Sequence, residues 1–181
     1  MNSLAVPTLA DDESLVAELH RLHVTHLARI TITPDITPLA PVNLITGLAV
    51  HPDARFQTSL ILLFLRHPDF QLYLRDSLEQ LDPAGTLTLK LYYQAAVYLQ
   101  RELMTDLAFQ LECRAVLTDY FSTGLGLPLA NTIRPGPRTA QPALDALGAQ
   151  HQLHSGWHFN WAGSYRQHIP LFLKHLGTHD L

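Results

Sequence analysis

LTLKLYYQAAVYLQRELMTDLAFQLECRAVLTDYF, residues 87–121, contains neither glycine nor proline. Read at the 3.6-residue period of a helix, it has two apolar faces and only a narrow polar stripe. The main apolar face holds Leu89, Tyr92, Ala96, Leu99, Leu103, Leu107 and Leu111; the second holds Leu91, Tyr98, Phe109, Cys113 and Val116; the stripe holds Lys90, Gln94, Arg101, Thr105, Glu112 and Asp119. A helix buried on most of its girth belongs at the centre of a bundle. We expect a long central helix, either unbroken or as two helices.

Two His-Pro-Asp tripeptides precede this stretch, at residues 51–53 and 67–69, and each is soon followed by Phe-Gln. His-Pro-Asp also occurs in J-domain co-chaperones, where it follows a basic helix; here apolar residues precede it, so we do not adopt that interpretation. Proline suits the first helical position and an acidic residue the first turn, so the tripeptides predict helix starts near 52 and 68. The first helix, Ala54–Arg66, is apolar all round and should be central. The second should end at residues 82–85, and its apolar face holds Phe70, Leu74, Leu78 and Leu81.

Before these tripeptides, the sequence predicts a helix after Asp11 and Asp12, whose short acidic side chains can cap it. Its apolar arc runs to Ile30 and contains two residues that are not apolar, His23 and His26. Its apolar members are Leu15, Leu19, Leu22, Leu27 and Ile30.

The remaining segments are proline-rich loops and short helices. Residues 31–41 carry three prolines and should form a loop over the bundle. A short helix should start at Pro142 and end near Gly148, and a closing helix lies near 171–176. Alternation of period two is absent beyond a brief run at 86–91. The prediction is an all-α, single-domain bundle of five or six helices spanning 1–181, with Pro-rich connecting loops.

Composition narrows the classes of function. Apolar residues make up 47% of the 181 residues, enough for a packed core, and the formal charge is −4. The 12 basic residues form no block, so nucleic acid is not an expected partner. A single cysteine, Cys113, allows no internal disulfide and fits a reducing compartment. Residues 1–10 lack the pattern of a secretory signal, and no apolar run is long enough to span a membrane. We therefore expect a cytoplasmic protein.

A metal site is one candidate for chemistry. His23 and His26 lie one turn apart in the apolar arc of the first helix, and Glu102 and Asp106 lie one turn apart on the long helix. Imidazoles and carboxylates from facing helices suit a first-row metal. The competing interpretation is that both histidines are neutral, hydrogen-bonded core residues and that the carboxylates face arginine or solvent. No cofactor is indicated by any motif.

Other candidates are weaker. His151, His154 and His158 would share one face of a helix and could bind metal together, although Ser155-Gly156 interrupts that helix. Arg21 and His26 match the loose Arg-x4–6-His spacing of the HEPN ribonuclease superfamily, a match expected by chance in a chain with this much Arg and His. Cys113 lies on an apolar face, where a thiol is usually inert.

The tail contains an aromatic segment with two tryptophans close together. Its candidate binding residues are Trp157, Phe159, Trp161 and Tyr165. Either they fix the tail onto the bundle, or they form a docking surface, since Trp and Tyr dominate binding hot spots. The leading hypothesis is a non-catalytic helical module that binds a protein partner or forms a homo-oligomer. The alternative is a metal-dependent helical-bundle enzyme, hydrolytic in type, using His23, His26 and a carboxylate.

Overall fold

The computed structural model describes residues 10–24, 27, 37–105, 115–156 and 163. In these ranges the chain is helical and contains no strand, which confirms the predicted all-α bundle. The elements in chain order are α1 (Asp12–Arg21), α2 (Pro41–Val50), α3 (Ala54–Arg66), the 3-10 helix η1 (Pro68–Tyr73), α4 (Leu74–Gln80), α5 (Pro83–Glu102), the 3-10 helix η2 (Ala130–Thr132) and α7 (Gln141–Ser155).

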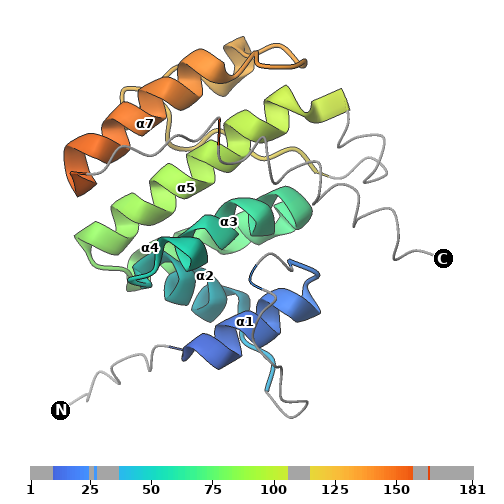
Figure 1. Cartoon of the computed structure of the whole chain (residues 1–181), viewed down its shortest axis with the longest axis vertical. Helices are drawn as coiled ribbons and strands as arrows, with labels where there is room; N and C mark the ends of the chain where they lie inside the picture. Colours follow the sequence, from blue (N-terminus) through green and yellow to red (C-terminus); the bar gives the residue numbers. More distant parts are fainter. Residues whose placement is uncertain (1–9, 25–26, 28–36, 106–114, 157–162, 164–181) are drawn as a thin grey trace.

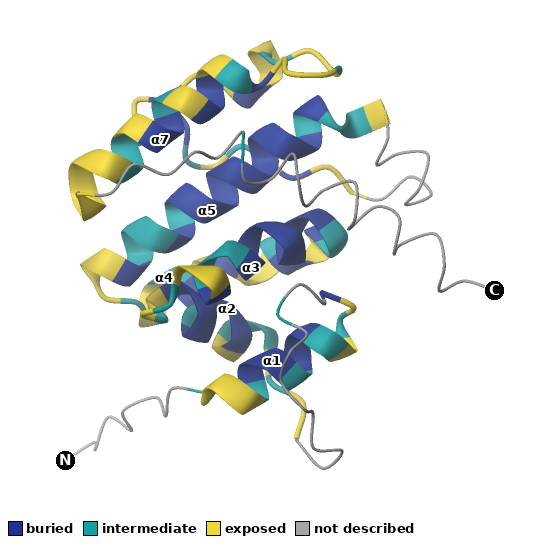
Figure 2. Cartoon of the chain, in the orientation of Figure 1, coloured by how far each residue is buried: buried dark blue, intermediate teal, exposed yellow. Residues whose placement is uncertain are grey.

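The helices are stacked along the longest axis of the molecule (Figure 1). From one end to the other, the order is α7, α5, α3 and α1, with α2 and α4 beside α3. Helix α5 packs most extensively on α3 and also on α2 and α7, whereas α1 packs on α2. The buried side chains concentrate where α2, α3 and α5 face one another (Figure 2). As predicted, the first part of the stretch, residues 87–102, lies in the central helix α5.

The helix starts follow from capping chemistry. A helix leaves its first N–H groups without partners, and a short acidic side chain just before it can accept one. Three aspartates do so: Asp11 accepts from Ser14 N (2.7 Å), Asp53 from Arg55 N (2.8 Å) and Asp82 from Gly85 N (2.7 Å). Asp82-Pro83, predicted to end one helix, therefore also begins α5.

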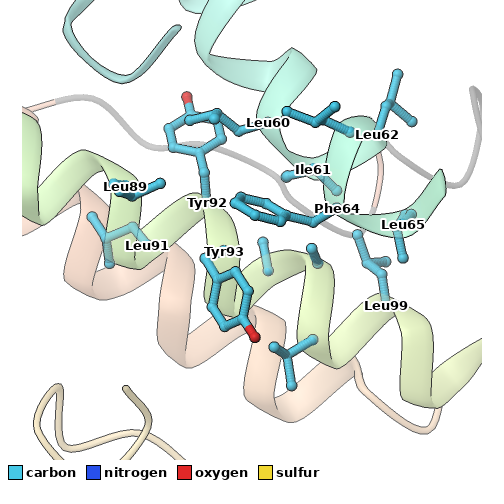
Figure 3. Packing of buried hydrophobic residues seen from close by; sticks show 14 of the residues in the cluster. Leu60, Ile61, Leu62, Phe64, Leu65, Leu89, Leu91, Tyr92, Tyr93 and Leu99 are labelled. Carbon is cyan, nitrogen blue, oxygen red and sulfur yellow. The ribbon is translucent and has the colours of Figure 1, made fainter. Parts of the chain in front are cut away.

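The core between α3 and α5 is built from leucine and aromatic side chains. Figure 3 shows Phe64 of α3 reaching toward Tyr92 and Tyr93 of α5. The Phe64 and Tyr93 rings meet edge to face, with centroids 4.9 Å apart and planes at 88°. Edge-to-face packing is a favoured arrangement of aromatic rings. Helix α3 has the predicted bounds, and eight of its residues are buried: Phe56, Ser59, Leu60, Ile61, Leu62, Leu63, Phe64 and Leu65.

Close approach of α1 and α2 depends on Gly47. A Cβ atom at this position would lie 2.9 Å from a methyl carbon of Leu15. Contacts this short are essentially never seen for real Cβ atoms, so a larger residue would require the Leu15 side chain to shift.

The first helix is shorter than predicted. Helix α1 ends at Arg21, and His23 has a φ of 57°, a left-handed conformation that stops an α-helix. The prediction that His23 is buried in the apolar arc is wrong: His23 is exposed. The turn after Arg21 breaks the helical period on which the apolar arc depends. His26 lies outside the described residues.

The central helix also ends earlier than the glycine- and proline-free stretch allows. Helix α5 ends at Glu102, and residues 115–120 are neither α-helical nor 3-10. Gln94, predicted on the polar stripe, is fully buried. The absence of helix breakers permits a helix but does not require one, and in residues 115–120 tertiary contacts prevail over propensity.

Two further elements differ from expectation. The predicted helix over 68–81 is a 3-10 turn followed by α4, and α7 continues past Gly148 to Ser155, where Gly156 closes it with a φ of 73°. Helix α2 was not predicted, although Pro41 stands at its first turn.

Candidate functional site

The structure does not bring the described members of the predicted metal site together. His23 follows α1 at one end of the molecule, whereas Glu102 ends α5 on the far side of α3 (Figure 1). Within the described ranges, no group of three or more His, Cys, Asp or Glu side chains could hold a metal ion. Asp106, like His26, lies outside the described residues, so a site that includes these two stays a prediction.

Glu102 has a structural role instead. Its side chain is 4% exposed, and its carboxylate accepts the N–H of Ala140 at 3.1 Å, just before α7. Its main-chain carbonyl accepts the N–H of Gly136 at 3.0 Å. A buried carboxylate needs a hydrogen-bond donor, which the N–H of Ala140 supplies here. Together, the two hydrogen bonds fasten the 136–140 turn to the end of α5.

The histidines near the C-terminus make local contacts. His151 and His154 lie on α7, where His154 Nδ1 is 2.8 Å from the carbonyl of Gln150 and His151 Nδ1 is 3.2 Å from the hydroxyl of Ser155. Because α7 ends at Ser155, the single helix face predicted to extend to His158 is interrupted. His158 lies outside the described residues. So do all four candidate binding residues of the aromatic segment, Trp157, Phe159, Trp161 and Tyr165, and their role stays a prediction.

The first His-Pro-Asp turn fixes one end of α1. His51 Nδ1 accepts the backbone N–H of Asp53 at 3.0 Å, so the proton of the neutral ring is on Nε2, which donates to Asp12 Oδ1 at 3.1 Å. The ring also stacks on Phe56, with centroids 3.8 Å apart. Arg55, hydrogen-bonded to Asp53, lowers the pKa of that carboxyl to about 2.

The second turn fixes the other end of α1. His67 Nε2 lies 2.8 Å from the carbonyl of Leu22, which can only accept a hydrogen bond, so the imidazole donates. The imidazole lies against Phe70, with centroids 5.7 Å apart. The two tripeptides are thus helix starts, as predicted, and their histidines hold opposite ends of the same helix.

A glutamine follows the phenylalanine in each turn, and each glutamine meets a tyrosine of α5. The hydroxyl of Tyr92 is 3.3 Å from Gln57 Oε1, and that of Tyr93 is 3.4 Å from Gln71 Oε1. The amide groups then differ: Gln57 Nε2 donates to His51 O at 2.8 Å, within its own turn. Gln71 instead contacts residues 116–118, which lie far along the chain.

Residues 115–118 are held by two glutamine side chains, one on each side, which we call the glutamine clamp (Gln71 and Gln100). Gln100 donates from Nε2 to the carbonyl of residue 115 (3.2 Å) and accepts the N–H of Leu117 at Oε1 (2.7 Å). Gln71 reaches the carbonyl of residue 116 (3.5 Å) and accepts the N–H of Thr118 at Oε1 (3.0 Å). The hydroxyl of Tyr93 completes the set by donating to Thr118 O at 2.8 Å.

Burial perturbs three tyrosines of α5. It raises the pKa of Tyr92 to about 12 and raises the pKa of Tyr93 and Tyr98 still further above the usual value. Loss of hydration is the main cause in each case, because an ionised phenol in an apolar core would lack solvent. These hydroxyls therefore act as neutral hydrogen-bond donors at physiological pH.

Large apolar side chains are exposed beside the clamp. Leu72 is 76% exposed and Tyr73 37%, both directly after Gln71; Val116 is 41% exposed and Tyr120 55%, both in the segment that the clamp holds or just beyond it. The Tyr120 ring stacks near Tyr93, with centroids 6.1 Å apart. We call these four residues the η1 patch. Gln71 joins the two stretches of chain that carry these four residues.

Sequence reasoning missed the clamp and the patch. The recurring Phe-Gln after each His-Pro-Asp was visible in the sequence and was the available signal for Gln71. Nothing local marked Gln100, whose partners lie 15 and 17 residues further along the chain.

No protein-family model, curated protein or solved structure matches the chain. In the described residues, no helix is both long enough and apolar enough to cross a bilayer.

Proposed function

We propose that the protein is a non-catalytic helical module that acts by binding a protein partner or a second copy of itself. The observation that supports this function is the η1 patch, two tyrosines and two aliphatic residues exposed on joined stretches of chain. Contiguous exposed apolar surface is typical of interaction sites, and tyrosine is enriched in binding hot spots. The predicted cytoplasmic location is part of the proposal.

The patch has a rigid base, which favours a binding role. Tyr120 rests on Tyr93, and Tyr93 in turn packs against Phe64 in the core. Asp119 accepts hydrogen bonds from the N–H and hydroxyl of Ser122 and from the N–H of Ala130, which fixes the turn after the patch. A preorganised surface loses less side-chain and loop entropy on binding than a flexible one.

The test is a comparison of two charge substitutions at equally exposed leucines. Leu72 in the patch is 76% exposed, and Leu153 on α7 is 78% exposed. We expect Leu72→Asp to reduce association at least ten-fold and Leu153→Asp to leave it unchanged. Self-association is measured by sedimentation equilibrium over a range of protein concentrations, and partner binding by quantitative capture from an extract of the native cells.

Trp161→Ala is the parallel variant for the aromatic segment. If it weakens association and Leu72→Asp does not, the interaction surface is the predicted aromatic segment rather than the η1 patch. A chain that is monomeric and captures no protein would contradict the proposed function, and one whose association is the same in all three variants would contradict both proposed surfaces.

A further inference from the structure

Residues 68–80, which form η1 and α4, bury one face and expose the other. The buried side chains recur at helical spacing, and they are Phe70, Leu74 and Ser77. On the opposite face, the exposed side chain of Leu72 stands between two exposed carboxylates, those of Asp69 and Asp76. This helical stretch therefore presents to solvent a leucine with an acidic residue on each side.

Helical geometry brings these three residues into one line. Side chains three apart eclipse one another in a 3-10 helix, which aligns Asp69 with Leu72 in η1. Tyr73 keeps a right-handed helical backbone where α4 begins, so Leu72 and Asp76, which are four residues apart, are also neighbours on the surface. We call Asp69, Leu72 and Asp76 the η1–α4 stripe.

The two carboxylates of the stripe carry uncompensated charge. Among the residues that the structure describes, neither Asp69 nor Asp76 has a hydrogen-bond or ion-pair partner for its carboxylate. Arg75 is the single basic residue between positions 68 and 80, and its guanidinium already pairs with Glu79 at 3.2 Å. The stripe thus combines exposed apolar surface with two negative charges that a partner can neutralise.

This charge pattern disfavours a second copy of the chain as the partner. In a symmetric dimer both subunits use the same surface, so the carboxylates of one stripe would face those of the other. Like charges brought together in an interface are unfavourable, whereas opposite charges speed association and select the partner. The formal charge of −4 on the whole chain adds attraction for a basic partner at longer range.

The spacing of the carboxylates limits the sequence of the partner. A 3-10 helix rises about 2.0 Å per residue and an α-helix about 1.5 Å, so the two aspartates lie about 12 Å apart along the axis, with Leu72 near the middle. In an extended segment, basic residues four apart span about 13 Å and share a side with the residue midway between them. In a helical segment, basic residues seven or eight apart span about the same distance.

We propose that the η1–α4 stripe binds a segment of a different protein that carries lysine or arginine on both sides of an apolar side chain. The apolar side chain packs on Leu72 and on the neighbouring Tyr73, which is 37% exposed. The two basic groups pair with Asp69 and Asp76. This inference rests on the proposed function, because it selects a basic protein segment, rather than a second copy, as the partner of the η1 patch.

The first test is a selection from a displayed library of random 12-residue peptides on the immobilised full chain. Leu72→Ser, which removes the apolar side chain without adding charge, is the chain for counter-selection. We expect the peptides retained by the unaltered chain alone to carry lysine or arginine on both sides of an apolar residue, at one of the two spacings given above. Retained peptides without this pattern, or equal retention by the two chains, would overturn the inference.

The second test measures the affinity of the most enriched peptide by isothermal titration calorimetry. Asp69→Asn and Asp76→Asn each remove one charge of the stripe, and Asp145→Asn removes one exposed charge from α7. We expect each stripe variant to bind about three-fold more weakly and the double variant about ten-fold more weakly, with Asp145→Asn unchanged. At about 0.5 M salt, where exposed charges are screened, the differences should fall below two-fold. Equal weakening by Asp145→Asn and the stripe variants, all folded by circular dichroism, would contradict the proposal.

The inference and the proposed function fail in different ways. If Leu72→Asp weakens self-association in sedimentation equilibrium while no basic peptide is selected, the module binds a second copy and only the inference is overturned. If Leu72→Asp leaves association unchanged and no peptide is selected, the role of the η1 patch in the proposed function is overturned as well.

Discussion

The two His-Pro-Asp turns start from the same residues and end with different partners. In both, the histidine holds one end of α1, the following phenylalanine lies against the imidazole, and the glutamine meets a tyrosine of α5. In the first turn, the Gln57 amide closes back on His51 O. In the second, the Gln71 amide holds residues 116–118. The repeated motif thus makes the same contacts to α1 and α5 in both turns, and only Gln71 also holds a distant segment of the chain.

The largest expected effect on stability comes from removing the Phe64 ring, which packs beside the two tyrosines that the glutamines of the two turns meet. Phe64 is fully buried, and Figure 3 shows it reaching toward both Tyr92 and Tyr93. Phe64→Ala leaves a large cavity and should lower the free energy of unfolding by about 3–5 kcal/mol. Urea denaturation measures the loss. A change below about 1 kcal/mol would mean that the two tyrosines are held in some other way.

Alkaline titration tests the two tyrosines together. In unfolded chains tyrosine ionises near pH 10, whereas the folded-state pKa of Tyr92 is about 12 and that of Tyr93 is raised further. Between these values the unfolded state has released the proton and the folded state has not, so stability is intact below pH 10 and falls as pH rises above it. In this pH range, each such tyrosine lowers the free energy of unfolding by about 1.4 kcal/mol per pH unit.

The comparison is sharpened by removing one hydroxyl at a time. The slope of unfolding free energy against pH, between pH 10 and 12, counts the protons that unfolding releases. Tyr92→Phe and Tyr93→Phe should each make this slope less steep by one proton, which is about 1.4 kcal/mol per pH unit. The slope is obtained from urea melts at a series of pH values. An unchanged slope in either variant would show that the corresponding phenol ionises normally in the folded protein.

Gln100→Leu removes one of the two side chains of the glutamine clamp, the one on the central helix α5. It leaves the N–H of Leu117, which Gln100 accepts at 2.7 Å, without that partner in a buried position. An unsatisfied buried group costs about 1–3 kcal/mol, so this variant should lose that much stability in urea. The exposed control on the same segment, Val116→Ala, should change stability by less than about 0.5 kcal/mol. Equal losses in the two variants would contradict the assigned role of Gln100.

The smallest effects are expected at the two histidines. His51→Ala and His67→Ala each remove one hydrogen bond to α1 and should each cost about 1 kcal/mol. Because the bonds lie at opposite ends of the helix, the losses in the double variant should add. Thermal melts of the two single variants and the double variant measure this. Strong non-additivity would show that the two turns act as one unit.

Comparison of the predicted helices with the observed ones shows which features of the fold hydrophobic periodicity can predict. Helix α3 and the central place of α5 were predicted because each has apolar residues around most of its girth, and packing then agrees with the local signal. The end of α1 was missed because Leu27 and Ile30 continue the apolar period beyond the left-handed residue His23. The glutamine clamp depends on hydrogen bonds between residues up to 47 positions apart, which no local pattern encodes.

For the candidate site too, the local features were predicted and the long-range ones were not. His-Pro-Asp was correctly interpreted as a helix start: Asp53 caps α3, and Pro68 begins the 3-10 helix η1, which has no side-chain cap. The metal hypothesis paired residues by helical spacing alone, and the structure places His23 and Glu102 apart, with the Glu102 carboxylate accepting the N–H of Ala140. Exposed fractions, which identify the η1 patch, exist only once the fold is known.

Hydrogen exchange at the Thr118 amide tests the difference between the two turns most directly. Gln71 accepts this N–H at 3.0 Å, and Gln57 does not contact it. After correction for any change in global stability, we expect exchange to be about ten-fold faster in Gln71→Leu, the factor that corresponds to losing about 1.4 kcal/mol of hydrogen bonding. In Gln57→Leu it should stay within two-fold of the unaltered chain. Equal exchange rates at Thr118 in the two variants would contradict the account.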